Sequence, residues 1–319
     1  MINIKNKILT LKDQNVTVLG AGVSGVYVSA LATSYGANVL LSDSQDMDLT
    51  VDQFTLLSKH GVRIENNGHS EDVFTSDFVI KSPGVPHSSE IVKKILRRDI
   101  PIISEVEFAY QLLNSDRIIA ITGSHGKSIT AKILLTLLKN TGHKVHSASG
   151  PQNPLSKVIL EEVVQEDDFI ILELNSFQLE DTYSFHPYIS VFLNIAKDKH
   201  DNDKLKIEHH LDIKLRIAQH QRDDDKYLFW EDDIILKKNK PAKVSTIAFG
   251  LNTKENGIYV KENHIYYNDE KLIAIDELLI SGDQNLLNLL AALNICKILN
   301  IECSQLLDSV KKLQIGEEA

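Results

Sequence analysis

The feature that most constrains this chain is an apolar strand pattern that runs directly into a glycine turn ending in Gly-Lys-Ser. Residues 118–122 read Ile-Ile-Ala-Ile-Thr, residues 123–128 read Gly-Ser-His-Gly-Lys-Ser, and a helical pattern follows from Ala131. A strand, a glycine turn and a helix in this order aim backbone N–H groups at an anion beside a helix N-terminus. The spacing G-x-x-G-K-S is a compressed relative of the common phosphate loop. It predicts a triphosphate-binding loop, against the alternative of an ordinary turn whose lysine faces solvent.

Each residue type in this loop suits one part of a magnesium–triphosphate ligand. The residues expected to surround ATP are Gly123, Ser124, His125, Gly126, Lys127 and Ser128. Lys127 supplies a positive charge for the β- and γ-phosphates, and the Ser128 hydroxyl suits Mg²⁺. Glu173 ends a later apolar run. Ligands of open α/β sheets bind beyond the carboxyl ends of the strands, so Glu173 is a candidate magnesium ligand, with a solvated strand-end acid as the alternative.

Composition and charge narrow the class of protein. A chain of 319 residues with 43% hydrophobic and 24% charged residues is typical of a soluble protein of about two domains. The net charge of −10 argues against a nucleic-acid partner. The sequence has neither a signal-peptide pattern nor an apolar run of about 18 residues, so we expect no membrane partner. Cys296 and Cys303 form no Cys-x-x-Cys pattern, which favours a reduced cytoplasm. We expect a monomer.

The chain alternates strand and helix patterns, and this alternation restarts near residue 114. The expected elements are strands over 15–19, 38–42, 78–81, 118–122, 144–147, 168–174 and 189–193, helices over 26–35, 205–221, 285–299 and 303–313, and short strands and hairpins over 226–268. Alternation of this kind implies parallel sheets covered by helices. The sequence therefore predicts an α/β protein, with a Rossmann-like domain over 1–113 and a P-loop-type ATPase domain over 114–313.

A second glycine loop precedes the first predicted helix. It comprises Gly20, Ala21, Gly22, Val23, Ser24 and Gly25. It follows a predicted strand and opens a helix, which is the context of a dinucleotide-type fingerprint, and Asp43 lies where an acid meets a ribose or a base edge. Taken by itself, the loop allows a nicotinamide dehydrogenase. Dehydrogenases need no triphosphate loop, so a diphospho-nucleotide in the first domain and ATP in the second account for both loops.

Further metal candidates follow the strand pattern over 189–193. Asp198 and His200 form a possible metal pair, although the polar sequence around them also fits a solvated loop. His209 and His210 are adjacent, and neighbours on a helix point apart, which disfavours a shared metal. Lys214 lies in the same predicted helix and, by itself, is typical of a surface lysine.

Several of these motifs together resemble the Mur ligases, the ATP-dependent amino-acid-adding enzymes of peptidoglycan synthesis. The resemblance runs from about Asn15 to Leu313, and its most specific elements are residues 20–25, 81–86, 121–128 and 173–180. The last of these reads Glu-Leu-Asn-Ser-Phe-Gln-Leu-Glu and is most similar to the D-glutamate-adding branch. His125 is more usual in the alanine-adding branch.

The resemblance implies a ligase with a role in cell-wall synthesis, cell shape and cell division. Its substrates would be UDP-N-acetylmuramoyl-L-alanine, held in the first domain, and D-glutamate, with ATP and Mg²⁺ in the second. The substrate carboxylate would be phosphorylated to an acyl phosphate, which the amino group of D-glutamate then attacks. The substrate contacts would be Gly20, Ala21, Gly22, Val23, Ser24, Gly25, Asp43, Ser82 and Gly84.

Other roles come from the same resemblance. Lys127, Glu173 and Lys214 would be the catalytic residues, and Lys214 matches a lysine that the family carbamylates. The metal ligands would be Ser128, Glu173 and His200, and the motif containing Asn285 and Asn288 would bind the nucleotide.

The chain also departs from the family pattern. Without a gap, Lys199 takes the place of the metal histidine, whereas a one-residue insertion restores His200. Residues 150–153 read Gly-Pro-Gln-Asn in place of Gly-Asn-x-Gly, and Gln284 stands where a histidine is common. Residues 314–319 match only the start of a third domain that carries the amino-acid pocket. The chain would thus be a ligase represented by two of three domains, or a truncated or degenerate homologue that binds UDP-sugar and ATP without ligation.

Overall fold

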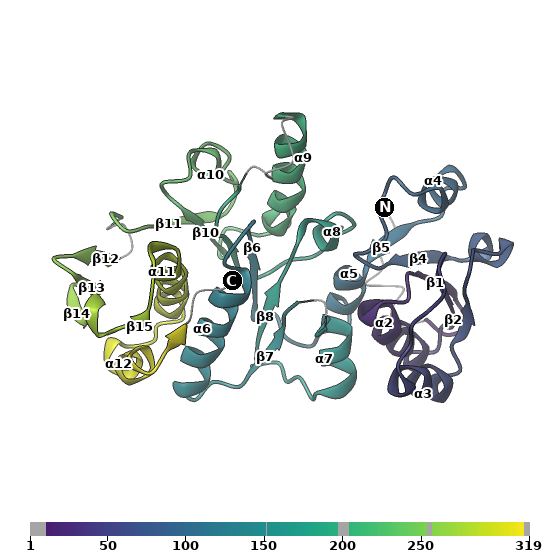
Figure 1. Cartoon of the computed structure of the whole chain (residues 1–319), viewed down its shortest axis with the longest axis horizontal. Coiled ribbons are helices and arrows are strands. Elements are labelled where there is room, and N and C mark those ends of the chain that lie inside the picture. The colour runs from purple at the N-terminus through teal and green to yellow at the C-terminus, as the bar shows by residue number, and fades with distance from the viewer. Residues whose placement is uncertain (1–10, 151, 197–203, 254–256, 316–319) are drawn as a thin grey trace. The chain divides into compact units, whose positions relative to one another are not determined.

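The computed structural model describes residues 11–150, 152–196, 204–253 and 257–315. Contacts divide the chain into two compact units (Figure 1). The first unit comprises Met1–Asn114, Gly150–Val164 and Ser176–Phe185, and the second comprises Ser115–Ser149, Gln165–Asn175 and His186–Ala319. Both are built on parallel sheets, which confirms the α/β fold class. The sequence limits of 1–113 and 114–313 remain our proposal for the domains.

The first unit holds a five-stranded sheet in the order β3-β2-β1-β4-β5. Its strands are β1 (Asn15–Leu19), β2 (Asn38–Ser42), β3 (Arg63–Glu65), β4 (Phe78–Lys81) and β5 (Ile102–Ser104), all parallel. β1 and β4 are buried along nearly their whole length, as parallel strands covered on both faces require. The strand order changes direction between β1 and β4. A ligand crevice is expected beyond the carboxyl ends of these two strands.

Helices surround this first sheet. They are α2 (Val23–Ser34), α3 (Val51–His60), α4 (Glu90–Arg97), α5 (Glu105–Tyr110), α7 (Leu155–Glu161) and α8 (Ser176–Leu179), with the 3₁₀ helix η1 (Glu71–Thr75). α3 begins with a capping box between Thr50 and Gln53 and ends at Gly61, whose φ of 70° is left-handed. α2 packs against α3 and α7, and α5 also packs against α7. The later segments 150–164 and 176–185 therefore complete the first unit.

The second unit holds a six-stranded parallel sheet in the order β11-β10-β9-β6-β8-β7. Its strands are β6 (Ile118–Thr122), β7 (Val145–Ala148), β8 (Phe169–Glu173), β9 (Ile189–Phe192), β10 (Lys226–Trp230) and β11 (Ser245–Phe249). β6 is buried throughout and lies between β8 and β9. Because all three strands are parallel, the loops that follow them meet at one edge of the sheet.

The helices of the second unit are α6 (Lys127–Asn140), α9 (Lys204–Leu215), α10 (Ile234–Lys238), α11 (Asp283–Ile298) and α12 (Cys303–Lys311), with the 3₁₀ helices η2 (Arg216–Ala218) and η3 (Ile275–Glu277). α11 is buried almost all round and packs against α6 (Figure 1). This pair anchors the helix that follows the phosphate loop. None of the helices in the described part of the chain is long and apolar enough to cross a bilayer.

One sequence expectation in the second unit was only partly correct. We predicted short strands and hairpins over 226–268, and residues 258–261 and 264–267 do pair as antiparallel strands. β10 and β11, however, extend the main sheet as parallel strands joined through α10. α10 spans only five residues, too few to show a helical period in the sequence. Among the residues that the structure describes, antiparallel pairing is confined to β12 (Ile258–Lys261), β13 (His264–Tyr267) and β14 (Glu270–Ala274). The two short strands β15 (Leu279–Ile280) and β16 (Gln314–Ile315) pair in parallel.

Candidate functional site

The phosphate loop turns tightly between β6 and α6. Gly123 has a φ of 156° and Gly126 a φ of 83°, a region that side chains rarely adopt. A Cβ placed on Gly126 would lie 2.4 Å from Oδ1 of Asn288 in α11. Gly126 is therefore required both by its backbone conformation and by the close approach of α11, and Gly123 by its backbone conformation.

Asn194, the second residue after β9, holds the tip of this loop. Its Oδ1 accepts hydrogen bonds from the backbone N–H groups of Ser124 (3.1 Å) and His125 (2.9 Å), and its Nδ2 donates to the His125 carbonyl (3.1 Å). The backbone N–H of Ala196 donates to Ser124 Oγ at 3.0 Å. Sequence reasoning missed this positioning role. The sequence held no signal for it, because the contact depends on β9 lying next to β6 in the sheet.

Two lysines converge on the carbonyl oxygen of Gly123. Lys127 Nζ donates to it at 2.9 Å and to the Ser124 carbonyl at 3.3 Å, while Lys214 Nζ donates to the Gly123 carbonyl at 3.2 Å. Burial lowers the pKa of Lys127, partly offset by Glu173. Burial together with the charge of Lys127 lowers the pKa of Lys214 to about 8. Two amines beside one loop favour a strongly anionic ligand.

Ser128 and Glu173 form the oxygen pair predicted for a metal. Ser128 Oγ donates to Glu173 Oε1 at 2.8 Å, from the first turn of α6 to the end of β8. A hydroxyl and a carboxylate at this separation are ligands that Mg²⁺ uses beside phosphates, so the donor set fits that ion. The third predicted ligand, His200, lies outside the described residues, as do Asp198 and Lys199.

The two asparagines of α11 have different surroundings. Asn285 Nδ2 donates to the Ser281 carbonyl at 2.9 Å. Asn288 is 1% exposed, its Oδ1 accepts from Gln284 Nε2 at 3.4 Å, and among the described residues its buried Nδ2 has no hydrogen-bond partner. A buried, unpaired donor beside Gly126 is costly unless a ligand meets it. The structure thus brings Asn288 to the phosphate loop, with Asn285 one turn earlier in the same helix.

The glycine loop of the first unit lies at the carboxyl end of β1, beside the loop that follows β4. Ser82 Oγ donates to the Gly20 carbonyl at 2.9 Å, and the Ala21 N–H donates to Asp43 Oδ2 at 2.8 Å. A Cβ on Gly25 would lie 1.9 Å from the Gly20 oxygen, which explains the glycine at this position. Five of the predicted substrate residues therefore lie together, namely Gly20, Ala21, Gly25, Asp43 and Ser82. Space around Gly22 and Gly84 is open, Ser24 is buried, and Val23 lines the pocket described next.

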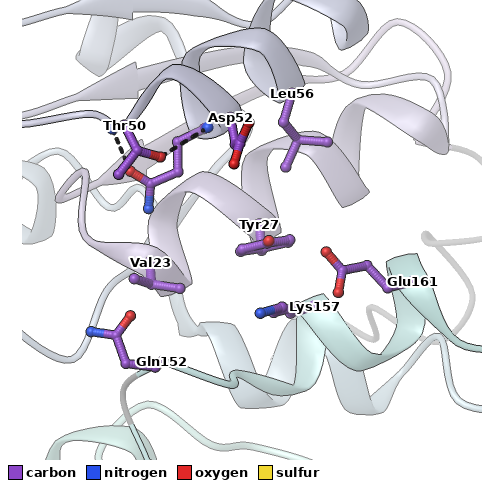
Figure 2. Close-up of a pocket in the computed structure, with 9 residues that line it drawn as sticks. Val23, Tyr27, Thr50, Asp52, Leu56, Gln152, Lys157 and Glu161 are labelled. Atoms are coloured by element: carbon purple, nitrogen blue, oxygen red, sulfur yellow. Dashed lines mark hydrogen bonds between the residues drawn. The ribbon is translucent and has the colours of Figure 1, made fainter.

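A polar pocket of about 320 Å³ lies beside the glycine loop in the first unit (Figure 2). It is lined by Val23, Tyr27, Thr50, Asp52, Gln53, Leu56, Gln152, Lys157 and Glu161. Lys157 Nζ lies 5.2 Å from the centre of the Tyr27 ring. Burial and a hydrogen bond with Glu161 raise the pKa of Tyr27. With one ammonium group and two carboxylates in its lining, the pocket suits a polar group of low net charge better than a second phosphate.

A parallel α/β unit with a G-x-x-G-K-S loop at its strand-order switch defines a nucleotide-binding protein. Comparison with known protein families supports this class and identifies the family. Residues 121–296 match the Mur ligase middle domain, and residues 15–91 match the MurD N-terminal domain. The chain belongs to the Mur ligase family.

Named relatives support this assignment. The chain is 35% identical over 227 residues to UDP-N-acetylmuramoylalanine–D-glutamate ligase of Bacteroides fragilis, covering 70% of this chain and 50% of the relative. It is 34% identical over 252 residues to the ligase of the same name from Thermoanaerobacter sp. strain X514, covering 78% and 55%. The chain spans about half the length of the relatives it matches.

Solved structures share the fold at lower identity. A UDP-N-acetylmuramate:L-alanyl-gamma-D-glutamyl-meso-diaminopimelate ligase from Neisseria meningitides has a TM-score of 0.65 at 15% identity and covers 96% of this chain and 100% of that one. The MurF ligase of Thermotoga maritima, solved in complex with ADP, has a TM-score of 0.51 at 18% identity, covering 99% and 68%. At such identities these likenesses support the fold alone.

Proposed function

We propose that this chain forms the UDP-substrate-binding and ATP-binding parts of an ATP-dependent, ADP-forming ligase that adds D-glutamate to UDP-N-acetylmuramoyl-L-alanine. The observation that carries the proposal is the phosphate loop, with Lys127 at its base and the Ser128–Glu173 pair beside it. The names of the relatives supply the substrates. As in the sequence expectation, we place the protein in the cytoplasm.

In this proposal the second unit aligns the triphosphate and neutralises its charge. The N–H groups at the start of α6 face the phosphates, and Lys127 leaves the Gly123 carbonyl to contact the transferring group. Ser128 and Glu173 would hold Mg²⁺, which would supply positive charge to neutralise the triphosphate. Asn194 keeps the loop tip in place, and Asn288 offers its buried N–H to the nucleotide. Catalysis then rests on alignment and electrostatics rather than on a covalent enzyme intermediate.

The first unit would hold the other substrate. The N–H groups at the start of α2 are available to a diphosphate, with Ser82 and Asp43 fixing the loop around it. The adjacent pocket, with Tyr27 as its flat wall and few net charges, suits an uncharged polar part of the UDP-sugar. The carboxylate of UDP-N-acetylmuramoyl-L-alanine would be phosphorylated by ATP to an acyl phosphate. The amine of D-glutamate would then attack this acyl phosphate, with loss of phosphate.

Calorimetry tests the proposal directly. UDP-N-acetylmuramoyl-L-alanine and Mg-ATP should each bind the chain, and NADH should not, because a dehydrogenase needs no triphosphate loop and the diphosphate crevice is proposed here for the UDP-sugar. UMP serves as a control that lacks the diphosphate. Tight NADH binding without a response to the UDP-sugar would contradict the proposed function.

A binding protein without ligase activity is the second candidate. Residues 150–153 read Gly-Pro-Gln-Asn, so Pro151 stands in the sequence where the family pattern has its asparagine. Phosphate release with and without D-glutamate, with the products separated by chromatography, distinguishes the two. Glutamate-dependent formation of a UDP-dipeptide would establish the ligase, whereas ligand binding with no such product would favour the second candidate.

We also expect Lys214 to accept CO₂. A pKa of about 8 leaves part of this buried amine neutral near pH 7. The neutral nitrogen can attack CO₂, forming an N–C bond and releasing a proton to leave an anionic carbamate. At fixed dissolved CO₂ the carbamate should increase from pH 7 to pH 8.5, because the neutral fraction rises through the pKa. Carbon-13 NMR in labelled bicarbonate should show the signal in the wild type and lose it in Lys214→Ala. A signal that persists in the variant would contradict the assignment.

A further inference from the structure

A buried charged cluster in the first unit lies outside both predicted ligand sites. Asp181, which follows α8, is 2% exposed and accepts from His87 Nε2 at 2.8 Å. Lys81 Nζ, whose side chain is fully buried, lies 3.2 Å from the other oxygen of Asp181 and 3.6 Å from Glu180 Oε2. Lys81 also donates to the Val85 carbonyl at 3.2 Å. The Asp181 carboxylate therefore contacts both ends of the segment 81–87.

The cluster has donor groups for a metal, but its charges disfavour one. His87, Glu180 and Asp181 each offer a ligand atom, and these atoms lie within 4.8 Å of one another. The ammonium of Lys81 already lies beside both carboxylates. A divalent ion would be repelled by this fixed charge at close range. A cluster of this kind serves better as an ionic clamp than as a metal site.

The segment that Asp181 holds forms one wall of the expected diphosphate crevice. β4 ends at Lys81 and pairs with β1, whose last residue, Leu19, lies opposite Lys81 in the register. Ser82, directly after Lys81, donates to the Gly20 carbonyl, and Val85 lies against Gly20. Any shift of the segment 81–87 would therefore move the glycine loop.

We propose that Asp181 is a positioning residue that clamps the loop 81–87 against the glycine loop and so sets the affinity for the UDP-sugar diphosphate, with His87 as a protonation-dependent part of the clamp. The inference rests on the proposed function of the first unit. Asp181 itself is too buried to touch the substrate, so it acts through Ser82 and Gly20.

The charge balance explains why protonation of His87 matters. Lys81 carries one positive charge, and Glu180 and Asp181 carry two negative charges, so a protonated His87 makes the cluster neutral. The hydrogen bond with Asp181 raises the pKa of His87, although burial and Lys81 oppose this. Among the described residues, the charged groups that face His87 are Lys81, Glu180 and Asp181. The clamp should be firmer at pH 6 than at pH 8.

Calorimetry with UDP-N-acetylmuramoyl-L-alanine at pH 6 and pH 8 tests the clamp, because this diphosphodiester does not titrate in that range. The wild type should bind about threefold tighter at pH 6, and Asp181→Asn should bind about tenfold weaker than the wild type. His87→Gln keeps a hydrogen-bond donor but no titration, so its affinity should not change with pH. Mg-ATP affinity should stay unchanged in both variants, which excludes general misfolding. His60→Gln, in α3, is the matched control and should retain the wild-type pH dependence.

Hydrogen exchange separates failure of the clamp from failure of the function. In the ligand-free protein, Asp181→Asn should speed exchange of the amides at 82 and 85. If the wild type binds no UDP-sugar, the proposed function is wrong. The exchange rates still test whether Asp181 holds the loop 81–87 in place. Wild-type exchange in Asp181→Asn, or wild-type affinity of both variants at both pH values, would overturn the inference.

Discussion

Replacing Lys127 with alanine should abolish the stabilisation that Mg-ATP gives the wild-type chain. A ligand present at 100 times its dissociation constant stabilises a protein by about 2.7 kcal/mol. Lys127 Nζ lies at the base of the phosphate loop, held only by the carbonyls of Gly123 and Ser124 among the described contacts, so it is available to the phosphates. Its loss removes the charge closest to the expected β- and γ-phosphates. Thermal unfolding with and without Mg-ATP measures the effect.

The control for this experiment lies on the same helix. Lys132 is an exposed lysine of α6, so Lys132→Ala changes the net charge by the same amount without touching the loop. It should retain the full ligand-induced shift. The comparison uses shifts rather than absolute melting temperatures, because Lys127→Ala also removes two hydrogen bonds of the free protein. A wild-type shift in Lys127→Ala would show that the triphosphate does not bind this loop.

The two glycine loops could be predicted from local sequence, and so could the strands β1, β2, β4 and β6 to β9, whereas the three-residue strands β3 and β5 were missed. β1, β4 and β6 are buried parallel strands, and such strands appear in the sequence as continuous apolar runs. Gly20 and Gly126 adopt left-handed conformations that favour glycine, so the loop motif itself carries the backbone geometry. Helix limits were less accurate: α2 begins at Val23, three residues before the predicted start.

The contacts that support the site could not be predicted. His87 and Asp181 are 94 residues apart in the sequence, and their pairing depends on how the segment after α8 returns to the first unit. Asn194 and His125 are 69 residues apart, and only the adjacency of β6 and β9 joins them. Neither the residue types nor their spacing in the sequence indicates which of these residues pair. Family resemblance identified the residues expected to touch ligands, but not those that hold them.

The largest stability effect is expected at Glu107, a buried carboxylate of α5. It accepts hydrogen bonds from the backbone N–H groups of Tyr183, Ser184 and Phe185, and from the side chains of Ser184 and Gln111. Each of these groups donates a hydrogen bond to the Glu107 carboxylate. Glu107→Gln would place an NH₂ group among these donors and remove the charge that they stabilise. We expect a loss of about 3 kcal/mol in the free energy of unfolding, as for other buried, multiply bonded charged groups.

Glu105, two residues earlier, provides the matched comparison, because the same substitution should have the opposite consequence there. Its Oε1 accepts from the Ser156 N–H at 2.6 Å, while its buried Oε2 has no partner among the described residues. Burial raises the pKa of Glu105 above its value in the unfolded chain. Folding therefore favours the protonated form, and the wild type loses stability as the pH rises through the folded pKa. Glu105→Gln keeps the acceptor and never ionises, so its stability relative to the wild type should increase with pH.

Urea unfolding followed by circular dichroism at pH 5 and pH 8 distinguishes the two glutamates. Glu107→Gln should be less stable at both pH values, and the amides of Tyr183, Ser184 and Phe185 should lose protection from hydrogen exchange. Glu105→Gln should equal or exceed the wild type at pH 8. The contrast follows from the donors around each carboxylate rather than from burial, since both side chains are buried. Equal losses in the two variants would mean that burial alone sets the cost, and that the bonds from Glu107 to residues 183–185 do not anchor the segment that carries Asp181.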